Sequence, residues 1–315
     1  MSKSVHNMIL VGTLVSLLVA CQQTPTPVAS EPTVPTRVVE HAMGTSAVPI
    51  SPERVVVLDT APLDTALALG IQPVGTVIYS EFPDYLKGKV SEITVVGEGN
   101  QPNLETILKL EPDLILGSKT GSAPGLYQQL SQIAPTVFTE GSGRENDWQE
   151  NFQLYAEALG QSEQARQLLQ SYQQRARQLQ ETLGQPQAIE VSVLIAHSDR
   201  IRSYTTGSFS GSVLQDIGFS RTAAQDVTQD YTLEISAEAL DKLDGNYIFL
   251  IYSTFRPGGF TANDFIADPI WSQLTAVQQD RVCQVTGEVW AAGRSLLAAN
   301  QILTDVKKCL GNFSE

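Results

Sequence analysis

The sequence predicts an α/β protein with two lobes joined by a single long α-helix. Three observations support this fold class. Strand and helix patterns alternate along most of the chain, one helix–strand unit occurs in each half, and an uninterrupted helical stretch separates the halves. Such alternation is typical of sheets whose strands are connected through helices. The chain has 315 residues, 42% of them hydrophobic, which is enough for two lobes with real cores.

The first residues have the pattern of an export signal. Residues 1–20 have the form of a signal peptide, with Lys3 in a short polar start and an apolar run from Met8 to Val19. The run ends in Leu-Val-Ala-Cys, which resembles the bacterial lipobox and predicts lipidation of Cys21. The alternative is an ordinary signal peptide followed by a chance cysteine. Acyl chains on Cys21 would hold the protein to a bilayer, because each buried methylene contributes about 0.8 kcal/mol.

Residues 21–52 are predicted to form a linker. Six prolines, from Pro25 to Pro52, are interleaved there with Thr, Ser and Val. A segment of this composition buries too little surface to fold, so we expect a semi-extended spacer between the lipid and the body.

The first lobe is expected at residues 53–160. Runs rich in Val, Ile and Leu predict strands at 54–58, 73–78, 94–97, 113–117 and 135–139. Helices are expected at 63–69, 103–110 and 127–133. Asp59 or Thr60 can cap the first helix, and Pro62 suits its first turn.

The connecting helix is expected at residues 161–185. The stretch from Ser162 to Leu183 lacks Gly and Pro, and its apolar residues follow helical spacing. A helix of this length spans roughly 33 Å, which is long enough to pass from one lobe to the other.

The second lobe is expected at residues 186–315. Strands are predicted at 190–196, 201–205, 247–252 and 281–285, and helices at 212–217, 237–243 and 295–310. The helix–strand unit NLETILKL…DLIL of the first half is matched by SAEALDKL…YIFL in the second, which gives Glu105 and Glu238 equivalent places. The helix dipole alone also favours Glu in a first helical turn, so the match does not decide their role.

The remaining two cysteines are Cys283 and Cys309. Export places them in an oxidising compartment, where such a pair often forms a disulfide. This bond would join the C-terminal helix to a strand, and two free thiols are the alternative.

Catalytic motifs are absent from the sequence. His197 is the only histidine of the predicted body, and Phe209 occupies the centre of Gly207–Gly211, where a nucleophile-elbow Ser would stand. One histidine cannot build a multi-His metal site. The formal charge of −14 disfavours nucleic acids. An exported hydrolase that uses His197 and an adhesion lipoprotein without a ligand stay as alternatives to a binding protein.

Ligand-binding candidates follow the strands, because α/β sheets hold ligands at the carboxyl ends of their strands. Aromatic walls with a few cations suit a planar or anionic ligand, and Arg binds carboxylates through two hydrogen bonds. Each aromatic residue can instead be part of the core. The candidates are Thr60, Gln101, Lys119, Trp148, Tyr204, Phe209, Tyr252, Arg256, Trp290 and Arg294.

The body from about Arg54 to Lys308 resembles the helical-backbone solute-binding proteins of bacterial ABC importers for ferric siderophores and cobalamin. The resemblance is closest to the ferric citrate-type branch. The segments that carry it are RVVVLDTAPLDTALALG, GNQPNLETILKLEPDLILGSK, LYQQLSQIAPTV, GSFSGSVLQDIGF, DPIWSQLTAVQQDRV and EVWAAGRSLLAA.

The resemblance implies two Rossmann-like lobes with a ligand cleft between them. It also implies that Glu105 and Glu238 pair with arginines of the permease, with Glu234 as a competing candidate in the second lobe. Lys119 stands where many relatives carry Arg, which puts bidentate binding there in doubt.

The ligand implied is a Fe(III)-siderophore of the carboxylate or hydroxamate type, and cobalamin is the alternative. The protein would touch the organic shell of the complex, with Lys119, Arg256 and Arg294 supplying positive charge. No cofactor and no protein-bound metal are expected. The implied partners are an ABC permease and its ATPase, and the protein would be a lipid-anchored monomer that faces the periplasm or the cell exterior.

Overall fold

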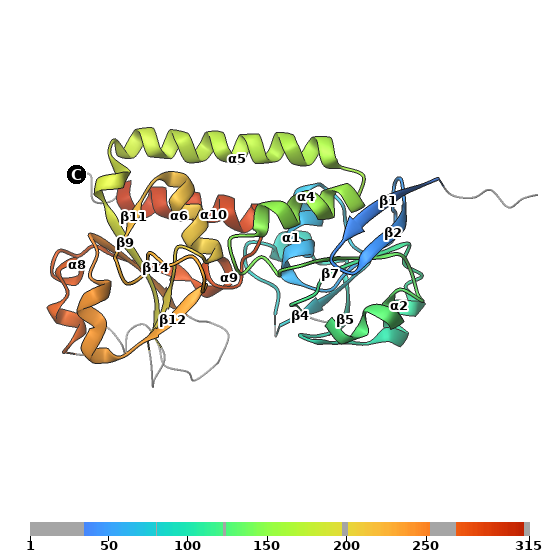
Figure 1. The fold of residues 1–315 in the computed structure, drawn as a ribbon, viewed down its shortest axis with the longest axis horizontal. Coiled ribbons are helices and arrows are strands. Elements are labelled where there is room, and N and C mark those ends of the chain that lie inside the picture. The colour runs from blue at the N-terminus through green and yellow to red at the C-terminus, as the bar shows by residue number, and fades with distance from the viewer. Residues whose placement is uncertain (1–34, 80, 122–123, 197–200, 253–268, 312–315) are drawn as a thin grey trace, which may run out of the picture. The chain divides into compact units, whose positions relative to one another are not determined.

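The first lobe is built on a six-stranded sheet (Figure 1). The computed structural model describes residues 35–311 except 80, 122–123, 197–200 and 253–268. The sheet has the order β6-β5-β4-β3-β7-β8 and is parallel except for β6. Its strands are β3 (Val55–Val57), β4 (Gly75–Ile78), β5 (Thr94–Glu98), β6 (Gln101–Pro102), β7 (Leu114–Ser118) and β8 (Thr136–Thr139). The three valines of β3 are fully buried, as expected for a central parallel strand covered on both faces.

Helices connect these strands. They are α1 (Thr60–Ala68), α2 (Leu104–Lys109) and α3 (Tyr127–Leu130). Helix α4 (Trp148–Ala158) follows β8 and leads into the connecting helix. The predicted cap at Asp59 is in place, and its side chain accepts a hydrogen bond from the Thr60 amide. Asn103, which was expected inside the second helix, caps α2 and accepts a hydrogen bond from the Thr106 amide. Helix α4 was not predicted from the sequence.

The described part of the second lobe also forms a six-stranded sheet. Five of its strands lie in the order β12-β10-β9-β13-β14, and β11 pairs with β9. They are β9 (Glu190–Ala196), β10 (Ile201–Tyr204), β11 (Ser220–Arg221), β12 (Thr232–Ile235), β13 (Tyr247–Tyr252) and β14 (Val282–Thr286). Strand β13 is parallel to β9 and β14, whereas β10 is antiparallel to its neighbours.

The α-helices among the described residues of this lobe are α6 (Phe209–Ile217), α8 (Thr275–Gln278), α9 (Gly287–Trp290) and α10 (Leu296–Gly311). Helix α6 starts earlier than predicted because Ser208 caps it and accepts a hydrogen bond from the Gly211 amide. The predicted helix at Ala237–Leu243 is a 3-10 helix, η4.

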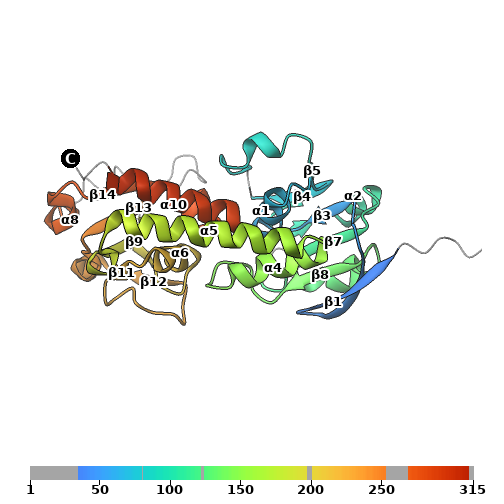
Figure 2. The ribbon, with the colours of Figure 1, turned by 90° about the horizontal axis from the view of Figure 1, so that it is seen from above.

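Helix α5 (Ser162–Leu183) joins the two lobes, so the α/β fold with one connecting helix is confirmed. It packs on α4 beside the first sheet and on α6 and α10 beside the second (Figure 2). Helix α10 of the second lobe also contacts α1 and α4 of the first lobe, so it forms part of the interface between the lobes.

A β-hairpin occupies part of the predicted linker. Strand β1 (Thr36–His41) pairs with β2 (Gly44–Pro49), and both lie against β8. Val39 and Val48 are fully buried in the main core, and Arg37 donates hydrogen bonds to the carbonyls of Pro49 (2.9 Å) and Ala158 (3.4 Å). The linker prediction is therefore wrong for residues 36–49, because inward-facing valines anchor a segment that its prolines make look unfolded.

Candidate ligand-binding site

A pocket of about 280 Å³ lies at the carboxyl ends of β3 and β4. Thr60 and Tyr79 line it from the first sheet, and Arg144 lines it from the loop between β8 and α4. Arg294, just before α10, lines it from the second half of the chain. Two of the predicted ligand-binding residues, Thr60 and Arg294, therefore lie at one pocket to which both halves contribute.

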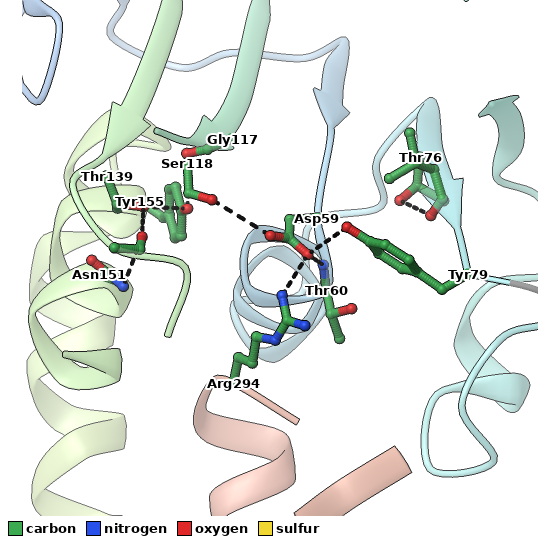
Figure 3. Close-up of polar contacts among 12 residues, drawn as sticks. Asp59, Thr60, Thr76, Tyr79, Gly117, Ser118, Thr139, Asn151, Tyr155 and Arg294 are labelled. Atoms are coloured by element: carbon green, nitrogen blue, oxygen red, sulfur yellow. Dashed lines mark hydrogen bonds and ion pairs between the residues drawn. The ribbon is translucent and has the colours of Figure 1, made fainter. Parts of the chain in front are cut away.

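A buried ion pair underlies this pocket (Figure 3). Arg294 Nη1 lies 3.0 Å from Asp59 Oδ1, and both side chains are almost completely buried. The Asp59 carboxylate also accepts hydrogen bonds from Tyr79 (3.3 Å), from Ser118 (3.4 Å) and from the amide of Thr60 (2.8 Å). These four donors compensate the desolvation of the carboxylate, so the pair fixes Arg294 at the pocket.

The guanidinium of Arg294 is not fully satisfied. Its Nε is buried and has no hydrogen-bond acceptor among the residues that the structure describes. Its backbone is closely confined, because a Cβ on Gly143 (φ +81°) would lie 2.6 Å from the Arg294 carbonyl oxygen. The position of Arg294 is therefore fixed, and its Nε–H donor has no acceptor among the described residues.

The start of α10 is fixed to α1 by a second buried carboxylate. Asp64 accepts hydrogen bonds from the amides of Leu297 (2.8 Å) and Ala298 (3.0 Å). Burial raises the pKa of Asp64 to about 7, against these hydrogen bonds, which lower it. The Thr65 and Ser295 hydroxyls lie 2.9 Å apart beside it. The carboxylate satisfies amides that a helix start leaves open and suits the helix dipole.

Arg144 is a second cation of the pocket, which the sequence reasoning missed. It is half-buried and has no carboxylate within salt-bridge distance in the described part of the chain. Burial raises the pKa of Tyr204, while the positive charges of Arg202, Arg144 and Arg294 act to lower it. The signal available in the sequence was the Gly-Ser-Gly-Arg loop that follows a strand.

Four of the predicted aromatic residues lie in the core, and Tyr204 is one of them, at 8% exposure. Trp148 is fully buried, donates to Ser212 Oγ (3.2 Å) and packs edge-on against Tyr172. Trp290 is fully buried, stacks on Phe249 and donates to Asp305 (2.9 Å). Phe209 packs edge-on against Trp148 and is 2% exposed. These rings are therefore part of the hydrophobic core, the alternative that the sequence left open, and they do not line the pocket.

Lys119 and Gln101 lie on the surface, outside the pocket. Lys119 is exposed and pairs with Glu140 (2.6 Å), and Gln101 is exposed on the edge strand β6. Tyr252 lines a different cavity. Arg256 and His197 lie outside the described residues.

That different cavity is larger, about 620 Å³, and lies beside β14, α9 and α10. Its charged lining is mainly acidic: Asp84, Glu288 and Asp305 outnumber Lys308. An anionic ligand would be repelled there, so the smaller pocket with its two arginines is the better site for one. The Cys283–Cys309 disulfide, which joins β14 to α10 with Cα atoms 6.0 Å apart, also lines the larger cavity.

The glutamates predicted to contact a permease are solvent-exposed. Glu105 lies in the first turn of α2 and pairs with Lys109 (2.8 Å). Glu238 lies in the first turn of η4, where a hydrogen bond from Ser236 lowers its pKa. Glu234 lies on β12 and pairs with Arg202 across the strands (3.6 Å).

Comparison with known proteins agrees with this architecture. The sequence model of the periplasmic binding protein family matches residues 55–288. The chain belongs to this family. The probable siderophore-binding lipoprotein YfiY of Bacillus subtilis is 34% identical over 287 residues, which cover 86% of this chain and 87% of the relative. The achromobactin-binding periplasmic protein of Dickeya dadantii is 34% identical over 269 residues, with 82% and 87% coverage.

A solved structure extends the likeness to three dimensions. Staphylococcus aureus SirA complexed with staphyloferrin B has a TM-score of 0.77 and 28% identity, and the match covers 88% of this chain and 99% of SirA. The family consists of substrate-binding proteins, and this chain has their two-lobed fold.

Proposed function

We propose that this protein is the extracytoplasmic solute-binding component of an ABC importer and captures a ferric siderophore of the carboxylate or hydroxamate type. The observation that carries the proposal is the pair of arginines, Arg144 and Arg294, at one pocket lined from both lobes. Named relatives at 34% identity include a probable siderophore-binding lipoprotein and an achromobactin-binding protein.

The charge of the pocket supports an anionic ligand. The chain carries a net charge of −14, whereas this pocket is lined by two arginines. The local positive charge favours an anion that the rest of the protein would repel. The planar guanidinium binds a carboxylate through two parallel hydrogen bonds, and the buried Nε of Arg294 still lacks an acceptor within the described residues. Arg144 is half-buried and offers its guanidinium to a ligand carboxylate.

Iron is the cargo in this proposal, held by the atoms of the siderophore. No group of three or more His, Cys, Asp or Glu side chains suited to a metal occurs among the described residues. The protein recognises the organic shell of the complex, performs no catalysis and needs no cofactor.

The remaining features serve delivery to a membrane permease and its ATPase. Lipidation of Cys21 would anchor the protein on the periplasmic or outer side of a cell membrane, at high effective concentration near the permease. No helix in the described ranges is long and apolar enough to cross a membrane. The exposed Glu105 and Glu238 are the proposed contacts with permease arginines, and the receptor acts as a monomer.

Calorimetric titration tests the proposal. The body of the protein is titrated with ferric and metal-free forms of a citrate-based, a hydroxamate and a catecholate siderophore, and with cobalamin. We expect tight binding of at least one ferric complex and a loss of about tenfold in affinity for it in Arg144→Ala, which corresponds to about 1.4 kcal/mol.

Arg177→Ala is the matched control, because it removes the same charge from the exposed face of α5. Equal losses in both variants would show that only general charge matters. Tight binding of cobalamin without binding of any ferric complex would establish the cobalamin alternative.

A further inference from the structure

The pocket beside Arg144 and Arg294 has a pronounced apolar wall, which the proposed function does not explain. Six of its lining side chains carry only carbon and hydrogen: Leu63, Val77, Ile78, Phe82, Pro83 and Ala292. Ile78, Phe82 and Pro83 are only half-buried, so solvent reaches part of this apolar surface. Apolar walls with a few polar groups that fix orientation are typical of sites for amphipathic small molecules.

We propose that the ligand is an amphipathic ferric chelate, whose apolar arm (acyl or aryl) enters this pocket while its anionic chelating head lies at the two arginines. This inference rests on the proposed function and narrows its substrate class. Ferric citrate itself, which has no such arm, is then a weak ligand.

Charged and apolar residues lie on different sides of the pocket, so each side suits a different end of the ligand. Ile78, Phe82 and Pro83 belong to β4 and the loop after it, and the same loop contributes Glu81. Glu81 carries negative charge and lies 3.5 Å from Lys87. Arg144 and Arg294 come from other parts of the chain. An anionic head is therefore favoured at the arginines and disfavoured beside the β4 loop, where an apolar arm meets apolar partners.

Size points in the same direction. The pocket holds about 280 Å³, slightly below the range of roughly 300–1,000 Å³ typical of sites that enclose a whole ligand. It therefore accommodates part of a chelate. A wholly hydrophilic chelate placed there would lose water from carboxylate and hydroxyl groups that find no hydrogen-bond partner on Leu63 or Phe82, and such desolvation is unfavourable.

The test uses matched ligands. A citrate-based, a hydroxamate and a catecholate chelator are each prepared with and without a hexyl arm, loaded with Fe(III) and titrated into the protein. For the chelate class that binds, we expect the armed complex to bind at least tenfold more tightly, since each buried methylene contributes up to about fourfold.

Two variants locate the arm. Phe82→Ala removes one wall. Ile78→Thr keeps the branch at Cβ but replaces the ethyl arm with a hydroxyl, which is a smaller change, so at least one variant should leave the fold intact. Both should lower the advantage of the hexyl arm about tenfold or more, measured within each variant as the ratio of the affinities for the armed and armless complexes. Leu108→Ala, an exposed apolar residue on α2 outside the pocket, is the matched control and should not change this ratio.

The outcomes separate the two proposals. Equal binding of armed and armless complexes would overturn the amphipathic ligand and leave the ferric-siderophore function standing. An arm effect that survives both pocket variants would place the arm elsewhere and overturn the inference as well. If no ferric complex of any class binds, the proposed function itself falls, and the inference falls with it.

Discussion

The buried aspartates of α1 and the exposed glutamates of α2 and η4 place the same chemical group in opposite surroundings. Asp59 and Asp64 are almost fully buried, and each accepts hydrogen bonds from residues just before or within α10. Glu105 and Glu238 are exposed at the starts of short helices. The difference teaches that carboxylates near the pocket hold the two halves of the chain together, whereas those on the surface stay accessible to a partner.

The buried carboxylates should contribute more to the free energy of unfolding than the exposed ones. A buried ion pair that loses one partner leaves an uncompensated charge, whereas an exposed pair such as Glu105–Lys109 contributes little because water and salt screen it. Variants of the two regions should therefore separate stability from transport.

The largest effect is expected from Asp59→Ala. It leaves the Arg294 guanidinium buried without its carboxylate and should lower the free energy of unfolding by about 3–5 kcal/mol, measured by urea denaturation. The double variant Asp59→Ala/Arg294→Met removes both charges and should cost about 2 kcal/mol less than the sum of the single variants. Additive losses would show that the two side chains do not stabilise one another.

Asp64 should make stability depend on pH. Its pKa in the folded protein, about 7, lies above the value of an unfolded aspartate, because burial disfavours the charge. The folded state therefore holds a proton that the unfolded state has released, and stability falls as pH rises from about 4 to 7. The slope reaches at most about 1.4 kcal/mol per pH unit.

Denaturation of wild type and Asp64→Asn across this range measures the effect. Tyr85, Arg294 and Glu288 also titrate or carry charge nearby, so the difference between the two proteins isolates Asp64. Identical slopes would mean that Asp64 stays ionised throughout.

Gly143→Ala should produce an intermediate loss. The residue has φ +81°, and a Cβ would meet the Arg294 carbonyl oxygen at 2.6 Å, so both strain and a clash are expected. Gly184→Ala is the control, because Gly184 has a similar φ of +77° with open space around it. We expect about 1 kcal/mol for Gly184→Ala and at least about 2 kcal/mol for Gly143→Ala. Equal losses would remove the proposed constraint on Arg294.

The smallest effect on stability is expected from Glu105→Ala and Glu238→Ala. Both residues are exposed, so the free energy of unfolding should change by less than about 0.5 kcal/mol and ligand affinity should stay the same. Uptake of radioactive iron by cells that carry the double variant should nevertheless fall sharply. Normal uptake would exclude these glutamates as permease contacts and direct attention to Glu234.

The sequence was sufficient for the parts of the fold that local patterns encode. The valines of β3, the Asp59 cap and the Gly-free stretch of α5 were all readable, because each depends on neighbouring residues. The hairpin β1–β2 was missed, since its stability comes from packing on β8.

The pocket was only partly readable for the same reason. Arg294 was identified, but its partner Asp59 lies 235 residues away in sequence, and nothing local links them. Trp148 and Trp290 follow strands as ligand-contacting residues often do, yet their surroundings are set by α5, α6 and β13, which no sequence pattern could place.

The most direct test of the account is a crystal structure of the protein grown with a ferric siderophore that it binds, with anomalous diffraction recorded at the iron edge. We expect one iron peak beside the pocket lined by Thr60, Tyr79, Arg144 and Arg294, with siderophore atoms as the iron's ligands. An iron peak in the acidic cavity beside Cys283 and Asp305, or an iron held by protein side chains, would contradict it.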